Sequence, residues 1–367
     1  MTKPIFLLGE ARGTEEERLK STFVGGSGME LIRMLIEAGL MVKTDADKAL
    51  INSYYRTKDA RFTLALWDGH PEFYRTNVFQ IHPPRNDLTF FTGSKADALP
   101  GYPPLIKSKH VRDKFAPELA RLQTELLTVD PNLVICFGNT ALWAMTGKTG
   151  IMKLRGATTV STHTVSGFKL LPTYHPAAIM RQWENRPTVI ADLMKAAREA
   201  DTETVSRPQR QIWIEPSLDD IRTFIHDHIH GCRILSVDIE TSGTRITCIG
   251  FAPRRDLGIV IPFDDERTAN GSYWPDQESE RECWSLIRSI LVDRSIPKLF
   301  QNGLYDITFL WRAYGIPTFG AAHDTMLLQH ALHPEALKGL GYLGSLYSDE
   351  MAWKPLGKRP KTIKREN

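Results

Sequence analysis

A polar segment divides this chain into two halves, and the halves carry different patterns of apolar residues. Residues 200–211 read ADTETVSRPQRQ, with one proline and no apolar period, which is typical of a linker. A chain of 367 residues is long enough to bury two hydrophobic cores. We therefore predict two domains, residues 1–200 and 211–367, joined by a linker at 201–210.

The order of strand-like and helical patterns differs between the two domains. Before the linker, apolar strand-like runs alternate with amphipathic helical patterns, an order that favours an α/β layer with a mostly parallel sheet. After the linker, Ser217 and Asp220 form a capping box for a helix, and a meander of three β-like runs precedes further helices. This second order favours an α+β domain. The three runs are RILSVDIE, RITCIGFA and LGIVIPF.

Composition and charge exclude several classes of protein. The chain is 42% hydrophobic and 24% charged, and no apolar run approaches the roughly 20 residues that span a bilayer. The N-terminus lacks the pattern of a signal peptide, so we predict a cytoplasmic protein with no membrane partner. The four cysteines are widely spaced, which favours reduced thiols over disulfides or a zinc ribbon. A net charge of +3 is too small to identify a partner, so a nucleic-acid function must be argued from sites.

Two carboxylates interrupt a strand-like run in the second half, at Asp238 and Glu240 in ILSVDIETSG. Side chains two residues apart on a strand point to the same face, so these anions would converge on one spot. A hard divalent cation such as Mg²⁺ would relieve their repulsion. Further along, Asn302 and Asp306 are four residues apart on one face of an expected helix, which adds a third acid. The alternative is that the two strand acids are structural residues of a sheet edge.

The second domain carries a family resemblance in three motifs. SVDIET, QNGLYDITFL and HDTMLLQHAL resemble the first two exonuclease motifs, and the helix after them, of the DEDD-type 3′–5′ proofreading domains in bacterial-type family A DNA polymerases. The resemblance implies an α+β, ribonuclease H-like fold. It also implies that Asp238, Glu240 and Asp306 hold Mg²⁺ or Mn²⁺ ions, which activate a water and stabilise the leaving 3′ oxygen. Asn302 would support this site, and Asp324 would cap a helix or orient the ligands.

One part of the exonuclease pattern is missing. The family's third motif places a Tyr or His four residues before the last acid, some dozens of residues after the helix that matches HDTMLLQHAL. The sequence reaches Asn367 first, and the acids of YSDE at 347–350 have the wrong spacing. We therefore predict that the second domain is truncated before its third motif, and that its exonuclease activity is weak or absent unless another chain supplies the last acid.

The first half places polar residues at the ends of several apolar runs. LLGEARGTEEERLKSTFVGGSG ends a strand in Gly9 and Glu10 and continues into a glycine-rich turn, where free backbone N–H groups suit an anion or a carbonyl. The run lacks a GK[ST] ending and has no GxGxxG after a strand, so nucleotide binding is not favoured. Three further places hold polar residues at the ends of apolar runs: TNVFQIHPPRN, GNTALW and LPTYHPAAI.

Taken together, these motifs resemble the uracil-DNA glycosylase superfamily, most of all its family 4 type, over about residues 4–198. GEARG is similar to the family's GEAPG motif, with Arg12 in place of the proline, and TFVGGSG is similar to PFVGxAG. The resemblance implies a three-layer α/β/α domain that excises uracil from DNA by hydrolysis of the N-glycosidic bond.

The same resemblance implies roles for single residues. Phe23 would stack on the extruded uracil, and Asn77 would read its Watson–Crick edge, since an amide both donates and accepts hydrogen bonds. His175, in TYHP, would face the uracil O2 and stabilise the charge that grows on the departing base. Glu10 would position the attacking water. Two further residues are predicted to bind the base, Gly9 and Asn86.

The glycosylase motifs imply no cofactor for the first domain. The iron–sulfur cluster of the family 4 type needs four cysteines, including the cysteine of KCRPP, and this chain has His82 near that position. We therefore predict no iron–sulfur cluster.

Both resemblances lead to one functional hypothesis. The protein would excise uracil from DNA and bind DNA 3′ ends through a fused exonuclease-type domain, as in phage-type replicative polymerases. Its partners would be DNA and a DNA polymerase chain or domain, in the cytoplasm of a host cell if a phage encodes it. The alternative is a module without catalysis that recognises uracil or DNA and docks a polymerase.

Overall fold

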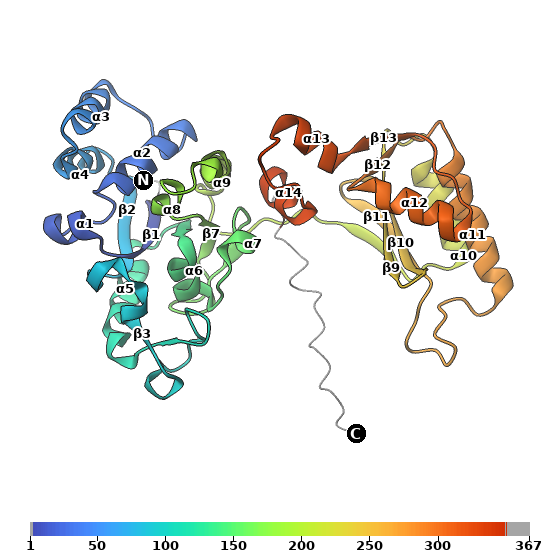
Figure 1. The fold of residues 1–367 in the computed structure, drawn as a ribbon, viewed down its shortest axis with the longest axis horizontal. Coiled ribbons are helices and arrows are strands. Elements are labelled where there is room, and N and C mark those ends of the chain that lie inside the picture. Colours follow the sequence, from blue (N-terminus) through green and yellow to red (C-terminus); the bar gives the residue numbers. More distant parts are fainter. Residues whose placement is uncertain (1–2, 349, 351–367) are drawn as a thin grey trace. The chain divides into compact units, whose positions relative to one another are not determined.

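The computed structural model describes residues 3–348 and 350, and it divides the chain into two compact units (Figure 1). The first unit holds the residues up to Ser206 and also those from Gly341 onward, while the second unit is Arg207–Leu340. The expected linker lies where the chain leaves the first unit. The return at Gly341 differs from the sequence-based boundary, which assigned everything after residue 210 to one domain.

A mostly parallel sheet forms the centre of the first unit, as predicted. Its strand order is β2-β1-β5-β7-β6, in which β6 alone runs antiparallel to its neighbour. Every residue of the inner strands β5 and β7 is buried, as expected of strands that are covered on both faces. Their bounds are β1 Ile5–Ala11, β2 Phe73–Phe79, β5 Val134–Phe137, β6 Thr159–Val160 and β7 Lys169–Thr173.

Helices cover both faces of this sheet, which gives the unit three layers. Leu7 points to one face and packs with residues of α2, α4 and α9, whereas Phe6 and Leu8 point to the other and pack with α5 and α6. The prediction of an α/β/α fold is confirmed. The helices are α1 Thr14–Leu19, α2 Gly26–Glu37, α3 Asp45–Thr57, α4 Ala60–Asp68, α5 Ala116–Val129, α6 Gly138–Thr146, α7 Ile151–Leu154, α8 Pro176–Ile179 and α9 Arg186–Glu199. Two short strands, β3 Thr92–Gly93 and β4 His110–Val111, pair between β2 and α5.

The second unit is built on a mixed sheet of order β13-β12-β9-β10-β11-β8. Strands β9, β10 and β11 form the predicted antiparallel meander, and β8, β12 and β13 each run parallel to a neighbour. The α+β prediction is therefore confirmed. The strands are β8 Gln211–Ile214, β9 Leu235–Ser242, β10 Arg245–Arg254, β11 Leu257–Pro262, β12 Lys298–Phe300 and β13 Ala321–Asp324.

The helices of the second unit pack on this sheet through one cluster of buried residues, which includes Phe224, Ile287 and Leu310. Ser217 and Asp220 form the expected capping box at the start of the first of them. The helices are α10 Leu218–Phe224, which continues into a π-helical turn at Ile225–Ile229, α11 Gln277–Val292, α12 Gly303–Tyr314 and α13 Thr325–Leu332. A last helix, α14 Leu340–Tyr347, begins where the chain returns to the first unit.

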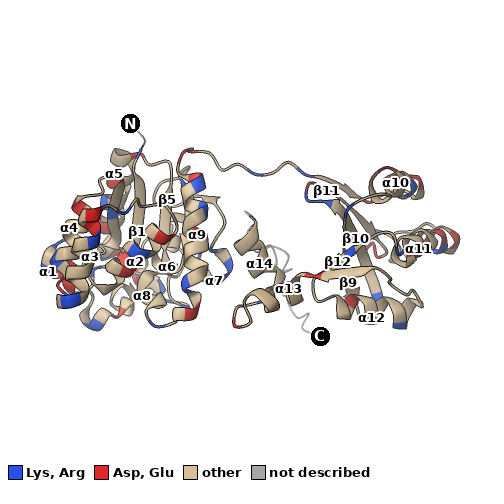
Figure 2. Ribbon diagram, turned by 90° about the horizontal axis from the view of Figure 1, so that it is seen from above, with Lys and Arg blue, Asp and Glu red and all other residues tan. Residues whose placement is uncertain are grey.

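Charges of both signs are mixed on the helices of both units, in line with the small net charge of +3 (Figure 2). Among the residues that the structure describes, no helix is long and apolar enough to cross a membrane.

Candidate functional site

The polar residues of the first unit gather at one edge of its sheet. Gly9 and Glu10 lie near the end of β1, Asn77 lies near the end of β2, and His175 lies two residues beyond the end of β7. Because β1, β2, β5 and β7 are parallel, their carboxyl ends meet at the same edge (Figure 1). Ligands of open α/β sheets commonly bind at this edge.

Phe23 is held in a conformation that a bulky residue rarely adopts. Its φ is +58°, in the left-handed region, and its side chain is only 1% exposed. The indole Nε1 of Trp67 donates to the Phe23 carbonyl at 2.8 Å, and a Cβ on Gly28 would lie 1.7 Å from the same oxygen. Gly28 is thus the residue that makes room for this turn. Backbone strain of this kind is concentrated at functional sites.

Gly9, Phe23 and Asn77 meet at one point. A Cβ on Gly9 would lie 2.2 Å from Asn77 Oδ1 and 2.9 Å from the ring of Phe23, so only glycine leaves room for both side chains. The Phe23 ring lies 6.0 Å from the His175 ring, measured between centroids. The structure therefore brings together an aromatic ring, an amide and an imidazole that sequence reasoning selected from separate motifs.

Glu16 is a member of this group that the sequence analysis did not identify. Its carboxylate is only 9% exposed and accepts hydrogen bonds from Gly13 N at 2.8 Å, from Phe23 N, and from Asn77 Nδ2 at 3.4 Å. In the sequence it stands among TEEER, which is typical of a solvated first turn of a helix. The available signal was its spacing, because a glutamate three residues after an N-cap is placed to accept the free N–H groups there.

Glu10 and His175 approach each other across Gly138, the first residue of α6. Gly138 has φ +87°, and a Cβ there would lie 2.7 Å from Glu10 Oε1 and 3.3 Å from His175 Cβ. Thr140 Oγ1 donates to Glu10 Oε1 at 3.3 Å. Gly138 and Thr140 belong to the GNTALW run, in which the Thr140 hydroxyl orients Glu10.

The contacts of His175 define which ring nitrogen carries the proton in its neutral form. His175 is the N-cap of α8, and its Nδ1 accepts a hydrogen bond from Ala177 N at 3.1 Å. A neutral imidazole has one donor and one acceptor nitrogen, so Nε2 is the donor. The helix start thus presents an N–H group at Nε2.

Asn86 does not join this group. It is exposed, lies in the short 3₁₀ helix Pro84–Asn86, and its Oδ1 is 3.1 Å from His82 Nε2. Asn77, in contrast, is buried, with 1% of its surface exposed. The two asparagines that were predicted to bind the base therefore lie in different environments.

The second unit brings three carboxylates to strand β9. Asp238 and Glu240 alternate with the buried residues Val237 and Ile239, so both carboxylates lie on the exposed face. Asp306, on α12, is 5% exposed and accepts a hydrogen bond from Ile239 N at 3.1 Å. Burial raises the pKa of the Asp306 carboxyl to about 6, and the nearby charge of Asp238 acts in the same direction.

Asp324 connects the starts of two helices. Its carboxylate accepts from Asn302 N and Gly303 N, at the start of α12, and from Met326 N in the first turn of α13. Although burial acts in the opposite direction, these backbone N–H groups lower the pKa of Asp324. Asn302 itself is the N-cap of α12 with φ +60°. Asp324 and Asn302 therefore position the helix that carries Asp306.

A groove of about 950 Å³ lies along α12. Its lining includes Thr244, Tyr305, Phe309 and Arg312, and the Tyr305 hydroxyl is 2.7 Å from Thr241 Oγ1, just beyond Glu240 on β9. Aromatic rings beside a guanidinium are the side chains on which single-stranded bases stack.

Hard carboxylate oxygens on β9 and α12 are the donor type that Mg²⁺ and Mn²⁺ prefer. Within the described part of the chain, however, no group of three or more His, Cys, Asp or Glu side chains is arranged to hold a metal ion. The donor types therefore fit a divalent ion, while the donor set is not complete.

The two units thus carry two different kinds of candidate site. The family profile described as "Uracil DNA glycosylase superfamily" matches residues 2–198. The chain belongs to this superfamily.

A curated relative extends the resemblance to phage polymerases. The DNA polymerase of Bacillus phage SP01 is 23% identical over 274 residues, which cover 66% of this chain and 27% of that protein. The chain thus spans about a quarter of the length of the relative it matches.

Two solved structures resemble a part of the chain. One is Escherichia coli RNase D, described as an exoribonuclease involved in structured RNA processing, which is 19% identical with a TM-score of 0.28. The match covers 39% of this chain and 34% of the RNase D chain. The other is Brucella melitensis NrnC with bound Mg²⁺, which is 20% identical with a TM-score of 0.26. The match covers 39% of this chain and 62% of the NrnC chain.

Proposed function

We propose that the first unit excises uracil from DNA by hydrolysis of the N-glycosidic bond. The observation that supports this most directly is the meeting of Phe23, Asn77, Glu10 and His175 at one edge of the sheet, around Gly9 and Gly138. A glycosylase needs a platform for an extruded base, a reader of its edge, and a donor for the charge on the leaving group. The first unit supplies one residue of each kind.

In this proposal, uracil stacks on Phe23 while the Asn77 amide donates to one edge atom and accepts from its neighbour. Glu16 accepts from Asn77 Nδ2 and so fixes which end of the amide is the donor end. Both Phe23 and Asn77 are 1% exposed, so a base reaches them only after it has left the stack.

The proposed bond cleavage uses His175 and Glu10 in separate roles. As the bond breaks, negative charge develops on uracil O2, and the N–H at His175 Nε2 stabilises it more in the transition state than in the ground state. Glu10, oriented by Thr140, holds a water for attack on the sugar carbon. None of these steps uses a cofactor.

The second unit is proposed to bind DNA 3′ ends as an exonuclease-type module. Bases of a single strand would stack on Tyr305 and Phe309 in the groove beside Arg312. Asp238, Glu240 and Asp306 would hold Mg²⁺ or Mn²⁺, which activates a water and stabilises the leaving oxygen when bound. Since the donor set is incomplete, we expect weak or absent cleavage by this chain alone. A DNA polymerase chain or domain, present with it in the host cytoplasm, is the proposed source of a further acid.

One assay tests both activities. A 5′-labelled single-stranded oligonucleotide with one internal uracil is incubated with the protein in EDTA or in Mg²⁺, and half of each sample is then treated with alkali. An alkali-dependent cut at the uracil in EDTA would establish a metal-free glycosylase. A ladder that appears only with Mg²⁺ would show that the second unit cleaves DNA with the acids of this chain alone.

His175→Ala is the variant that tests the glycosylase mechanism. We expect it to reduce uracil release by roughly a hundredfold or more, the usual cost of losing one donor to a developing oxyanion, while oligonucleotide binding changes little. Unchanged release would remove His175 from the mechanism. If the wild-type protein binds the oligonucleotide but gives no product in either lane, the module without catalysis is the better description.

A further inference from the structure

Asn77 lies on the end strand of the first sheet. Strand β2 comes first in the order β2-β1-β5-β7-β6 and pairs with β1. An end strand leaves backbone groups on its outer side without a strand partner, although buried carbonyls need donors. How the outer side of β2 is satisfied therefore affects the position of Asn77.

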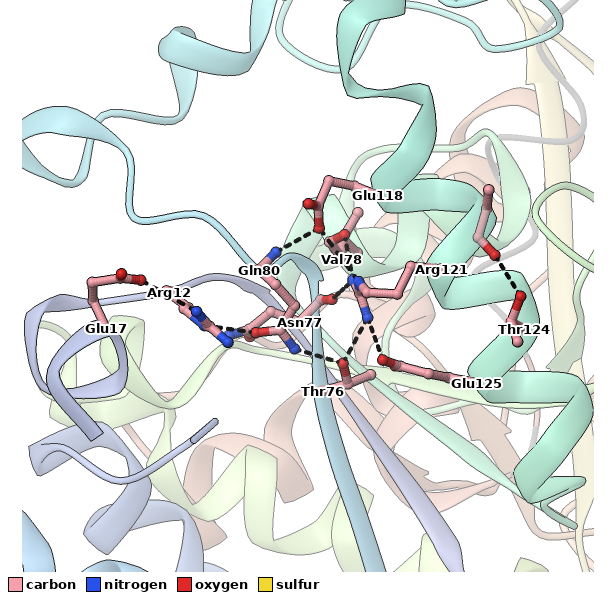
Figure 3. A network of polar contacts seen from close by, with 11 residues as sticks. Arg12, Glu17, Thr76, Asn77, Val78, Gln80, Glu118, Arg121, Thr124 and Glu125 are labelled. Atoms are coloured by element: carbon pink, nitrogen blue, oxygen red, sulfur yellow. Dashed lines mark hydrogen bonds and ion pairs between the residues drawn. The ribbon is translucent and has the colours of Figure 1, made fainter. Parts of the chain in front are cut away.

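Arg121, on α5, donates to this outer side through its guanidinium. Its Nη2 lies 2.7 Å from Asn77 O and 3.0 Å from Val78 O, and its Nη1 lies 3.1 Å from Thr76 Oγ1 (Figure 3). One side chain thus contacts three consecutive residues, and the planar fork of arginine presents several donors at fixed angles. Arg121 therefore supplies the hydrogen-bond donors that a neighbouring strand would supply to Asn77 O and Val78 O.

Two glutamates on the same helix hold the guanidinium. Glu125 Oε1 accepts from Arg121 Nη1 at 2.7 Å, and Glu118 Oε2 accepts from Arg121 Nε at 3.4 Å. Glu118 also accepts from the backbone N of Gln80 at 2.8 Å, one residue past the end of β2. The orientation of Arg121 is therefore determined by charge as well as by the strand (Figure 3).

Gln80 extends this network to the loop that follows β1. Its Nε2 donates to Thr76 Oγ1 at 2.8 Å, and its Oε1 accepts from Arg12 Nε at 2.8 Å (Figure 3). Arg12 stands where the glycosylase motif GEAPG has proline, and a proline side chain offers no donor for this contact. The loop that follows Glu10 and the strand that carries Asn77 are thereby joined.

We infer that Arg121, with the Arg12–Gln80 pair, is a positioning residue for base recognition, an inference that rests on the proposed glycosylase function. Arg121 does not touch the base. It fixes the β2 backbone at Asn77, so that the amide side chain meets the uracil edge at one angle. Misplacement of a recognition group by about 1 Å reduces a rate by up to a hundredfold.

The test is a double-mutant cycle in the full chain. We expect Arg121→Met to lower the single-turnover rate of uracil release by roughly ten- to hundredfold, and Arg121→Lys, which keeps the positive charge and one donor nitrogen, to lose less. In an Asn77→Ala background, Arg121→Met should change the rate by less than about twofold, because Arg121 acts through Asn77. An equal loss in both backgrounds would overturn the inference, since it would show a general loss of folded protein.

Thr124 provides a matched control on the same helix. Its hydroxyl donates to Ala120 O at 3.0 Å within α5, and its side chain is exposed (Figure 3). Thr124→Ala should leave the rate of uracil release unchanged, and a loss equal to that of Arg121→Met would overturn the inference.

A second readout separates this inference from the proposed function. The side-chain amide signal of Asn77, assigned through Asn77→Ala, should shift or broaden in the NMR spectrum of Arg121→Met and stay in place in Thr124→Ala. If the wild-type protein releases no uracil, the proposed function fails, but this measurement still decides the positioning role. An unmoved signal in Arg121→Met would contradict it.

Discussion

Glu16 connects three parts of the first site through a single carboxylate. It accepts from the loop at Gly13, from the turn at Phe23 and from the amide of Asn77. We expect Glu16→Ala to cost about 1–3 kcal/mol of stability for each buried N–H left without an acceptor. We also expect uracil release to fall roughly tenfold, because Asn77 is no longer held at one angle. Thermal unfolding and the alkali-cleavage assay measure the two effects.

Glu15→Ala is the control for this prediction. Glu15 is a neighbour on α1, and its carboxylate forms an exposed ion pair with Arg18, so its loss should change stability by less than about 1 kcal/mol. If Glu16→Ala and Glu15→Ala release uracil equally fast at a temperature where both are folded, Glu16 has no part in the site.

The residues of the first site differ in how far the sequence could reveal them. Gly9, Phe23, Asn77 and His175 stand in motifs that resemble those of the glycosylase superfamily, and this resemblance is what indicated them. Glu16 and Arg121 stand in helices, and their sequence neighbours resemble those of ordinary solvated faces. Their roles depend on which turn packs beside α1 and on which strand ends the sheet, and neither is a local property.

At the scale of elements, helix α14 packs on the first unit through buried polar groups. Lys195, on α9, is 5% exposed, and its Nζ donates to Gly156 O at 2.8 Å, to Ser345 O at 2.6 Å and to Ser348 O. Arg155 Nη1 donates to Ser345 Oγ at 3.0 Å. Because the last carbonyls of a helix lack partners within it, a lysine at this position caps α14.

We expect Lys195→Met to destabilise the first unit. The substitution leaves three carbonyls without this donor. A buried polar group that loses its partner lowers the free energy of unfolding by about 1–3 kcal/mol. Thermal unfolding should show a lower midpoint for Lys195→Met than for Lys153→Met, which removes the same charge from an exposed position on α7. Identical midpoints for the two variants would show that the cap on α14 contributes nothing to stability.

The order of strands and helices was predictable from hydrophobic periodicity, whereas the place of α14 was not. Runs in which apolar and polar residues alternate, and runs that are apolar throughout, both predict strands. Such runs indicated the parallel sheet of the first unit and the meander of the second. The run LGYLGSLY also shows an apolar face. Its period predicts a helix with one buried side but says nothing of which surface buries it, so sequence reasoning kept it with the segment before it.

At the scale of the whole molecule, the chain passes from the first unit to the second at Arg207 and returns at Gly341. The fragment that follows the linker therefore carries a part of the first unit. In that part, the Tyr342 hydroxyl lies 2.8 Å from the Thr188 hydroxyl of α9. The next residue, Leu343, is buried, with 6% of its surface exposed. Cutting the linker should not by itself free the two fragments.

A protease recognition sequence inserted after Ser206 tests this arrangement. After cleavage at high micromolar concentration, we expect the two fragments to elute together in size-exclusion chromatography and to separate in denaturant. The same cut in Lys195→Met should release the second fragment, because the cap on α14 is lost, while Lys153→Met should behave as wild type. If the wild-type fragments separate at every concentration, the residues from Gly341 do not hold to the first unit once the linker is open, and the boundary predicted from the sequence describes the folding units better.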